Sequence, residues 1–126
     1  KGFDFAASRN LARGGIISAE WTAQMVIAFK VMAGYWAQEA DPAKSRYYSD
    51  AAEDYLATLS SMVIASPSVS GQGDNCLPYA SQEVADTGHG WGTPRGNTTG
   101  SLSATAYALL AYHGYNPLEL QEEASR

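Results

Sequence analysis

The segment 86–91, Asp-Thr-Gly-His-Gly-Trp, places several chemically capable side chains within six residues. His89 can shuttle protons, Asp86 can orient the imidazole or act as an acid or base, and Trp91 can stack on the apolar face of a sugar. The two glycines beside His89 allow a ligand to approach the backbone closely. A structural interpretation stays open beside this one, in which Asp86 caps a turn, His89 donates to a backbone carbonyl and Trp91 packs over helix ends.

Glycoside hydrolysis normally uses two carboxylates, about 5–5.5 Å apart for retention and about 6.5–9.5 Å apart for inversion. The candidate catalytic residues are one histidine and three carboxylates: Asp86, His89, Glu83 and Glu20. For Glu20 the structural alternative is that it complements the dipole of a helix that begins beside it. The candidate substrate-binding residues are three aromatics and one threonine: Trp91, Thr87, Tyr79 and Trp21. The helical spacing of Trp21 and most of the tyrosines favours core packing over a sugar groove.

Other chemistry is poorly supported. Cys76 is the only cysteine, which excludes an internal disulfide and favours a buried, inert thiol. Asp74, Asp86 and His89 lack a recognised metal-ligand spacing, so we predict no metal site and no cofactor. The serines lie in no nucleophile elbow, and the glycines at 71 and 73 do not form a phosphate loop.

The composition bounds the class of protein. The 126 residues suffice for a single domain covering 1–126. Charged residues make up 17%, against the roughly 25% that is typical of soluble domains. The net charge of −5 argues against nucleic acid and anionic membranes as partners, and no apolar run is long enough to span a membrane.

Helix start and stop signals divide the chain into elements. We expect a short helix over 5–13 that ends at Gly14-Gly15, and a long, almost wholly apolar helix from Ser18 to about Glu39. Asp41-Pro42 begins the next helix, which we expect to run to about Ala65. The short link between the two long helices predicts an antiparallel hairpin.

The third predicted helix is amphipathic, and its expected core stripe follows helical spacing: Tyr47, Ala51, Tyr55, Leu59 and Met62. The stretch 66–100 holds seven of the twelve glycines and three of the five prolines, and its aromatic residues favour an ordered loop. A last apolar helix is expected from Ser101 to Gly114, closed by Asn116-Pro117 and followed by a solvated tail.

The predicted fold class is therefore all-α, an antiparallel helical hairpin and a terminal buried helix with a long glycine-rich loop. Two helices that are apolar nearly all round need more cover than three helices provide. We expect the chain either to form a homo-oligomer or to pack on helices that precede Lys1 in a longer chain.

The closing segment 99–118, "TGSLSATAYALLAYHGYNPL", resembles the last helical hairpins of (α/α) toroid proteins of the six-hairpin glycosidase-like superfamily. The resemblance covers about Ser18 to Leu118 and implies a saccharide-processing or saccharide-binding scaffold, with the 86–91 loop lining the site. A complete toroid needs several times as many helices, so the resemblance makes this chain a C-terminal fragment, incomplete as a glycoside hydrolase-like or polysaccharide lyase-like enzyme. The alternative function is a non-catalytic scaffold or oligomerisation module. A periplasmic or extracellular location follows only from the carbohydrate interpretation.

Overall fold

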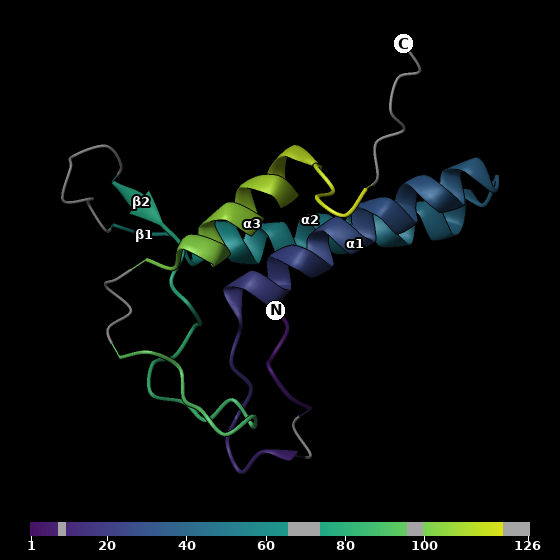
Figure 1. The fold of residues 1–126 in the computed structure, drawn as a ribbon. Coiled ribbons are helices and arrows are strands. Elements are labelled where there is room, and N and C mark those ends of the chain that lie inside the picture. The colour runs from purple at the N-terminus through teal and green to yellow at the C-terminus, as the bar shows by residue number, and fades with distance from the viewer. Residues whose placement is uncertain (8–9, 66–73, 96–99, 120–126) are drawn as a thin grey trace.

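The computed structural model describes residues 1–7, 10–65, 74–95 and 100–119. It contains three helices, α1 (Ala19–Gln38), α2 (Pro42–Ser61) and α3 (Leu102–His113). Two short strands, β1 (Ile64–Ala65) and β2 (Asn75–Cys76), pair antiparallel with Ile64 opposite Cys76. In Figure 1, α1 and α2 form an antiparallel hairpin, and α3 lies against it and runs in the direction of α1. The predicted all-α class and the helical hairpin are confirmed.

The helix ends follow from local capping. Ser18 and Ser101 accept hydrogen bonds from the first-turn N–H groups of α1 and α3, each at 3.3 Å. Asp41 caps α2 in the same way at 3.0 Å, with Pro42 at the first helical position. Gly114 ends α3 in the left-handed conformation, with φ of 69°. These boundaries match the sequence prediction within a residue.

Two predicted elements differ from the structure. The helix expected at 5–13 is wrong, because the described residues of 1–18 hold no α-helix. The Asp4 carboxylate accepts hydrogen bonds from Phe5 N, Ile16 N and the guanidinium of Arg13, which fixes this segment as an irregular loop. The second difference is the end of α2, which stops at Ser61 rather than Ala65 because the next residues pair as β1.

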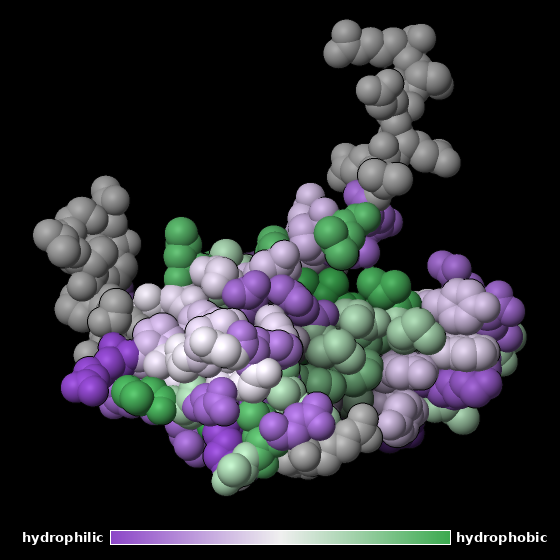
Figure 2. All heavy atoms as spheres, turned by 60° about the horizontal axis from the view of Figure 1, so that its bottom comes forward, coloured by the Kyte–Doolittle hydropathy of each residue, from purple (hydrophilic) through white to green (hydrophobic). Residues whose placement is uncertain are grey.

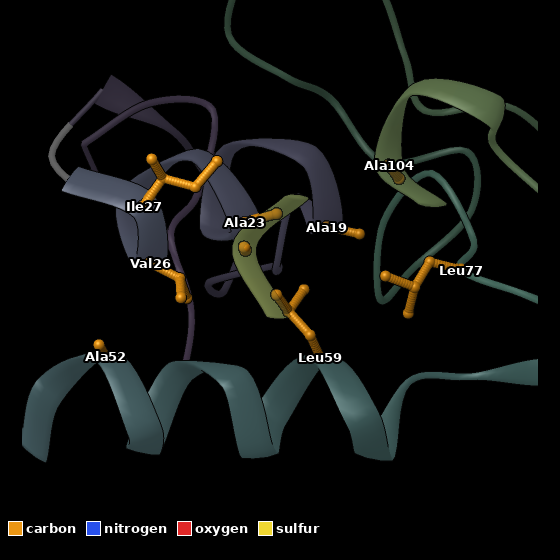
Figure 3. Packing of buried hydrophobic residues seen from close by; sticks show 9 residues of the cluster. Ala19, Ala23, Val26, Ile27, Ala52, Leu59, Leu77 and Ala104 are labelled. Atoms are coloured by element: carbon orange, nitrogen blue, oxygen red, sulfur yellow. The ribbon is translucent and has the colours of Figure 1, made fainter. Parts of the chain in front are cut away.

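The core lies where the three helices meet. Small residues of α1 and α3, Ala19, Ala23, Ala104 and Ala111, are fully buried and let the helices approach closely. Figure 3 shows side chains of α1, α2 and the loop pointing into the same space. The buried cluster comprises Ala19, Ala23, Val26, Ile27, Ala52, Leu59, Leu77, Ala104 and Ala111. These contacts fix the position of α3 on the hairpin, and with it the loop that precedes α3.

The buried face of α2 lies one residue away from the prediction in its first half. Tyr47 is 68% exposed, whereas Tyr48 packs on Phe29 of α1 with ring centroids 6.0 Å apart. Ala52 is buried in place of the expected Ala51, and Leu59 is buried as predicted. Aromatic contacts with α1 therefore decide which face of α2 turns inward.

The two apolar helices are only partly covered within this chain. The buried residues of α1 lie in its first half, and only Ala104 and Ala111 of α3 are buried. Leu102, Leu109 and Tyr112 of α3 are exposed, as are Val31 and Tyr35 of α1. Figure 2 shows a hydrophobic region near the middle of this face, with hydrophilic side chains on both sides of it. No helix in the described part is long and apolar enough to cross a membrane.

Much of the glycine-rich loop predicted at 66–100, and most of the predicted C-terminal tail, lies outside the residues that the structure describes. Residues 66–73, 96–99 and 120–126 belong to those predictions and fall outside the described residues. The described part, 74–95, is ordered by backbone bonds to the helix starts: Tyr79 O accepts from Ala19 N at 3.2 Å, and Leu77 O accepts from Ser101 N at 2.8 Å. The loop therefore joins the beginnings of α1 and α3, at the end where the N-terminal segment also lies (Figure 1).

Candidate functional site

Residues 84–93 form a narrow hairpin-like loop that presents His89 at its tip. Val84 N donates to Thr93 O at 3.1 Å, and Thr93 N donates to Ala85 O at 2.9 Å. The loop reverses through two glycines with positive φ, Gly88 at 78° and Gly90 at 84°. Other residues adopt this conformation only at an energetic cost, so the glycines determine where the loop turns.

Thr87 closes the tip of this loop from within. Its hydroxyl donates to Trp91 O at 2.6 Å and accepts from His89 N at 3.4 Å. Thr87 N also donates to Trp91 O, at 3.1 Å. The side chain is fully buried, so the predicted substrate-binding residue is placed inside the loop and holds Trp91 and His89 in position.

Asp86 caps a turn, as the structural interpretation of this segment predicts. Its Oδ1 accepts from Gly88 N at 2.8 Å, which makes a local turn, and its side chain remains exposed. The main-chain carbonyl of Asp86 accepts from Arg13 Nε. The hairpin is thereby bound to the N-terminal segment.

Arg13 makes a two-pronged ion pair with Asp4. Nη1 and Nη2 lie 2.8 Å and 2.7 Å from the two carboxylate oxygens, and both side chains are less than a fifth exposed. The guanidinium holds the pKa of Asp4 at about 2, with help from the N–H groups of Ile16 and Phe5 and against the effect of burial. Hydrogen bonding to Asp4 in turn raises the pKa of Arg13.

His89 is anchored to the same segment. Its Nε2 lies 2.7 Å from Phe5 O, and because a carbonyl only accepts, Nε2 carries the proton and donates. The imidazole packs edge-on against Trp21 at 6.1 Å between centroids. In the neutral ring, Nδ1 is then the nitrogen left to accept a proton or a hydrogen bond.

Four rings form what we call the aromatic cluster: Phe5, Trp21, Tyr79 and Trp91. Phe5 is 4% exposed and lies 5.2 Å from Trp21, 5.6 Å from Tyr79 and 5.5 Å from Trp91 between ring centroids. Trp21 is 37% and Trp91 43% exposed. Two indoles with solvent-accessible surface are therefore fixed on one buried ring.

Glu20 borders this cluster. It lies in the first turn of α1, and its Oε1 accepts from Gln24 Nε2 at 3.1 Å. Burial raises the pKa of the Tyr79 hydroxyl, and the nearby carboxylate of Glu20 raises it further. Glu83 is exposed in the turn before the hairpin.

The structure thus gathers several sequence candidates at one end of the molecule. It joins Trp21, Tyr79, His89 and Trp91, with Glu20 beside them. The sequence analysis missed Phe5, Asp4 and Arg13, which hold the set together. The sequence held one indication of the Asp4–Arg13 pair. Asp4 is the only carboxylate in the first nineteen residues, and a carboxylate that is buried needs a hydrogen-bonding or charged partner.

An apolar hollow lies beside the start of α3. It is an open pocket of about 260 Å³ between α2 and α3, lined mainly by apolar residues that include Leu56, Val63, Cys76, Leu109 and Tyr112. Cys76 is partly buried there, in contact with the position of Gly100. Across the described ranges, no three His, Cys, Asp or Glu side chains lie together as a metal site would require.

Comparison of the chain with protein-family models, with curated proteins and with solved structures returned no match. The likeness to (α/α) toroids therefore stays an expectation from the sequence. The function has to be argued from the geometry of the site.

Proposed function

We propose that the end of the molecule that carries the aromatic cluster binds saccharides. The observation that carries this proposal is the pair of partly exposed indoles, Trp21 and Trp91, both packed against the buried ring of Phe5. Indole faces stack on the apolar face of a pyranose ring. Packing against Phe5 restricts the motion of the indoles before binding, which lowers the entropic cost of binding.

Polar groups beside the rings support the same proposal. Glu20 and Gln24 lie on the first turns of α1, and the exposed carboxylate of Asp86 lies on the hairpin. Apolar sites with a few placed polar groups are typical of small-ligand binding. Sugar hydroxyls donate to carboxylates and accept from amide N–H groups, so these side chains match the ligand class.

Binding is better supported than hydrolysis by the described residues. The Asp86 carboxylate is used in its own turn, and Nε2 of His89 is used by Phe5 O. A glycoside hydrolase needs two carboxylates that face each other across the substrate. For a catalytic role, we propose Glu20 as one member of that pair, with the other supplied by helices that complete a toroid.

The experiment is a titration with neutral oligosaccharides that follows tryptophan fluorescence. Trp91→Ala is compared with Trp36→Phe, because Trp36 lies on the last turns of α1 with Lys44 Nζ 3.8 Å from its ring centre. We expect Trp91→Ala to weaken binding by about two- to tenfold, and Trp36→Phe to leave it unchanged. A folded wild-type protein that binds no sugar would overturn the proposal.

A second candidate function is assembly, and the apolar pocket between α2 and α3 favours it. Its lining residues Leu109 and Tyr112 are 57% and 66% exposed, and Val63 beside them is also exposed. Exposed apolar surface of this kind commonly marks an interface. We propose that a second copy of the chain covers it.

A further inference from the structure

Two carboxylates lie on the segments that carry the indoles of the aromatic cluster. Glu20 follows the N-cap of α1, directly before Trp21, and is close enough to act on the Tyr79 hydroxyl. Asp86, whose side chain is exposed, lies on the hairpin that carries Trp91. Each of the two indoles therefore has a carboxylate on its own segment, Glu20 before Trp21 and Asp86 before Trp91.

Among the described residues of the N-terminal segment beside the hairpin, Arg13 is already paired. Arg13 lies beside the hairpin, but its guanidinium is paired with both oxygens of Asp4 at 2.7 Å and 2.8 Å. Its Nε is used by the carbonyl of Asp86. Arg13 therefore has no free edge with which to pair the carboxylate of an acidic sugar in the bidentate manner that guanidinium groups favour.

The two carboxylates make local hydrogen bonds only, as far as the described contacts show. Asp86 accepts a hydrogen bond from Gly88 N, and its side chain is exposed to solvent. Glu20 accepts from the amide of Gln24. Neither carboxylate is neutralised by a salt bridge among the described residues.

We infer that the aromatic cluster selects sugars without acidic groups, and that it binds a cationic amino sugar more tightly than a neutral sugar of the same length. The inference rests on the proposed saccharide site and names its ligand class. Opposite unit charges about 4 Å apart in water change a binding constant by about fivefold, so the expected preference is about two- to fivefold at low salt.

The test uses three oligosaccharides of equal length: a glucosamine oligomer, a neutral glucose oligomer and a galacturonic acid oligomer. Binding is measured by tryptophan fluorescence at about 0.02 M and about 0.5 M salt, because salt screens the charge preference and leaves stacking intact. Glu20→Gln is compared with Glu53→Gln, which removes an exposed carboxylate of α2.

In the wild type, we expect the affinity to decrease from the cationic to the neutral to the anionic oligomer. The differences in affinity should become smaller at high salt. They should also become smaller in Glu20→Gln, but not in Glu53→Gln. Equal binding of the neutral and anionic oligomers at low salt would overturn the charge selection and leave the saccharide site standing. Binding of none of the three by folded protein would overturn the saccharide site itself.

Discussion

Arg13 is the residue on which the geometry of the site most depends. Its guanidinium holds Asp4, and its Nε holds the carbonyl of Asp86, so one side chain joins the N-terminal segment to the hairpin 84–93. Phe5 follows Asp4 directly and carries both the aromatic cluster and the hydrogen bond to His89. Substitutions of Asp4 should therefore alter the positions of the two indoles.

The Asp4–Arg13 pair makes stability depend on pH in a defined direction. The pKa of Asp4 is about 2 in the folded protein, against an ordinary value of 3.8, so the unfolded chain binds more protons between these values. The stabilisation is complete above about pH 4 and is lost as the pH falls toward 2. We predict that Asp4→Asn lowers the free energy of unfolding at pH 6 and reduces its decline between pH 4 and pH 2.

Urea unfolding at pH 6 and pH 3 checks this prediction. Asp54→Asn is the matched control, because Asp54 makes an exposed ion pair with Lys1 at 3.5 Å. Exposed pairs contribute little, so the control should follow the wild type at both pH values. The prediction fails if Asp4→Asn and the wild type lose the same free energy between pH 6 and pH 3.

At the scale of elements, α3 is held on α1 through its last turn. Lys30 Nζ donates to Ala111 O at 2.6 Å and to Tyr112 O at 3.1 Å, where the helix dipole places partial negative charge. We predict that Lys30→Met lowers the free energy of unfolding by about 1–3 kcal/mol, because two charge-assisted bonds are lost. Chemical denaturation followed by circular dichroism measures the change.

Arg46→Met provides the comparison for Lys30→Met. Arg46 pairs with Asp50 across one turn of α2 at 3.7 Å, and both side chains are mostly exposed. Its removal should cost less than about 0.5 kcal/mol. Equal losses in the two variants would show that Lys30 does not tether α3.

The three helices were predictable because their ends carry local signals. Ser18, Asp41, Ser101 and Gly114 act through bonds within one turn, so a single sequence shows them. The helix over 5–13 was wrongly predicted because contacts beyond one helical turn compete with it. The Asp4 carboxylate accepts hydrogen bonds from Arg13 and from Ile16 N. The buried face of α2 likewise depends on Phe29 of α1 rather than on the spacing within α2.

The sequence named three rings of the aromatic cluster, Trp21, Tyr79 and Trp91, but did not show how they are arranged. Trp21, Tyr79, His89 and Trp91 were named from their chemistry, yet only tertiary structure brings them onto Phe5. Thr87 shows most clearly what the sequence cannot predict. Its hydroxyl was expected to bind a sugar, but the side chain is fully buried and donates to Trp91 O. Which polar group faces solvent depends on the fold of the hairpin.

At the scale of the whole molecule, the apolar pocket between α2 and α3 determines the expected assembly state. We predict that the wild-type chain associates with itself in a concentration-dependent manner, and that Leu109→Glu shifts it toward monomer, because a charge in an apolar interface costs several kcal/mol unless it is paired. Sedimentation velocity over a range of concentrations measures this. Leu118→Glu is the control, since Leu118 is exposed beyond α3 and is not part of the pocket lining.

A wild-type chain that is monomeric at every concentration would exclude the second copy as the occupant of this pocket. Equal dissociation by Leu109→Glu and Leu118→Glu would place the interface elsewhere. The proposed sugar binding at the aromatic cluster is tested separately from both outcomes, because the pocket lining shares no residue with the cluster.

The proposed saccharide site is tested most directly by the indole N–H resonances of the three tryptophans in a ¹H–¹⁵N spectrum, recorded while a neutral oligosaccharide is added. Trp21 and Trp91 belong to the aromatic cluster, whereas Trp36 packs against Tyr35 near the far end of α1. We predict that the Trp21 and Trp91 signals shift together with one dissociation constant and that the Trp36 signal stays in place. Unchanged Trp21 and Trp91 signals in the folded protein at saturating sugar would contradict the proposed site.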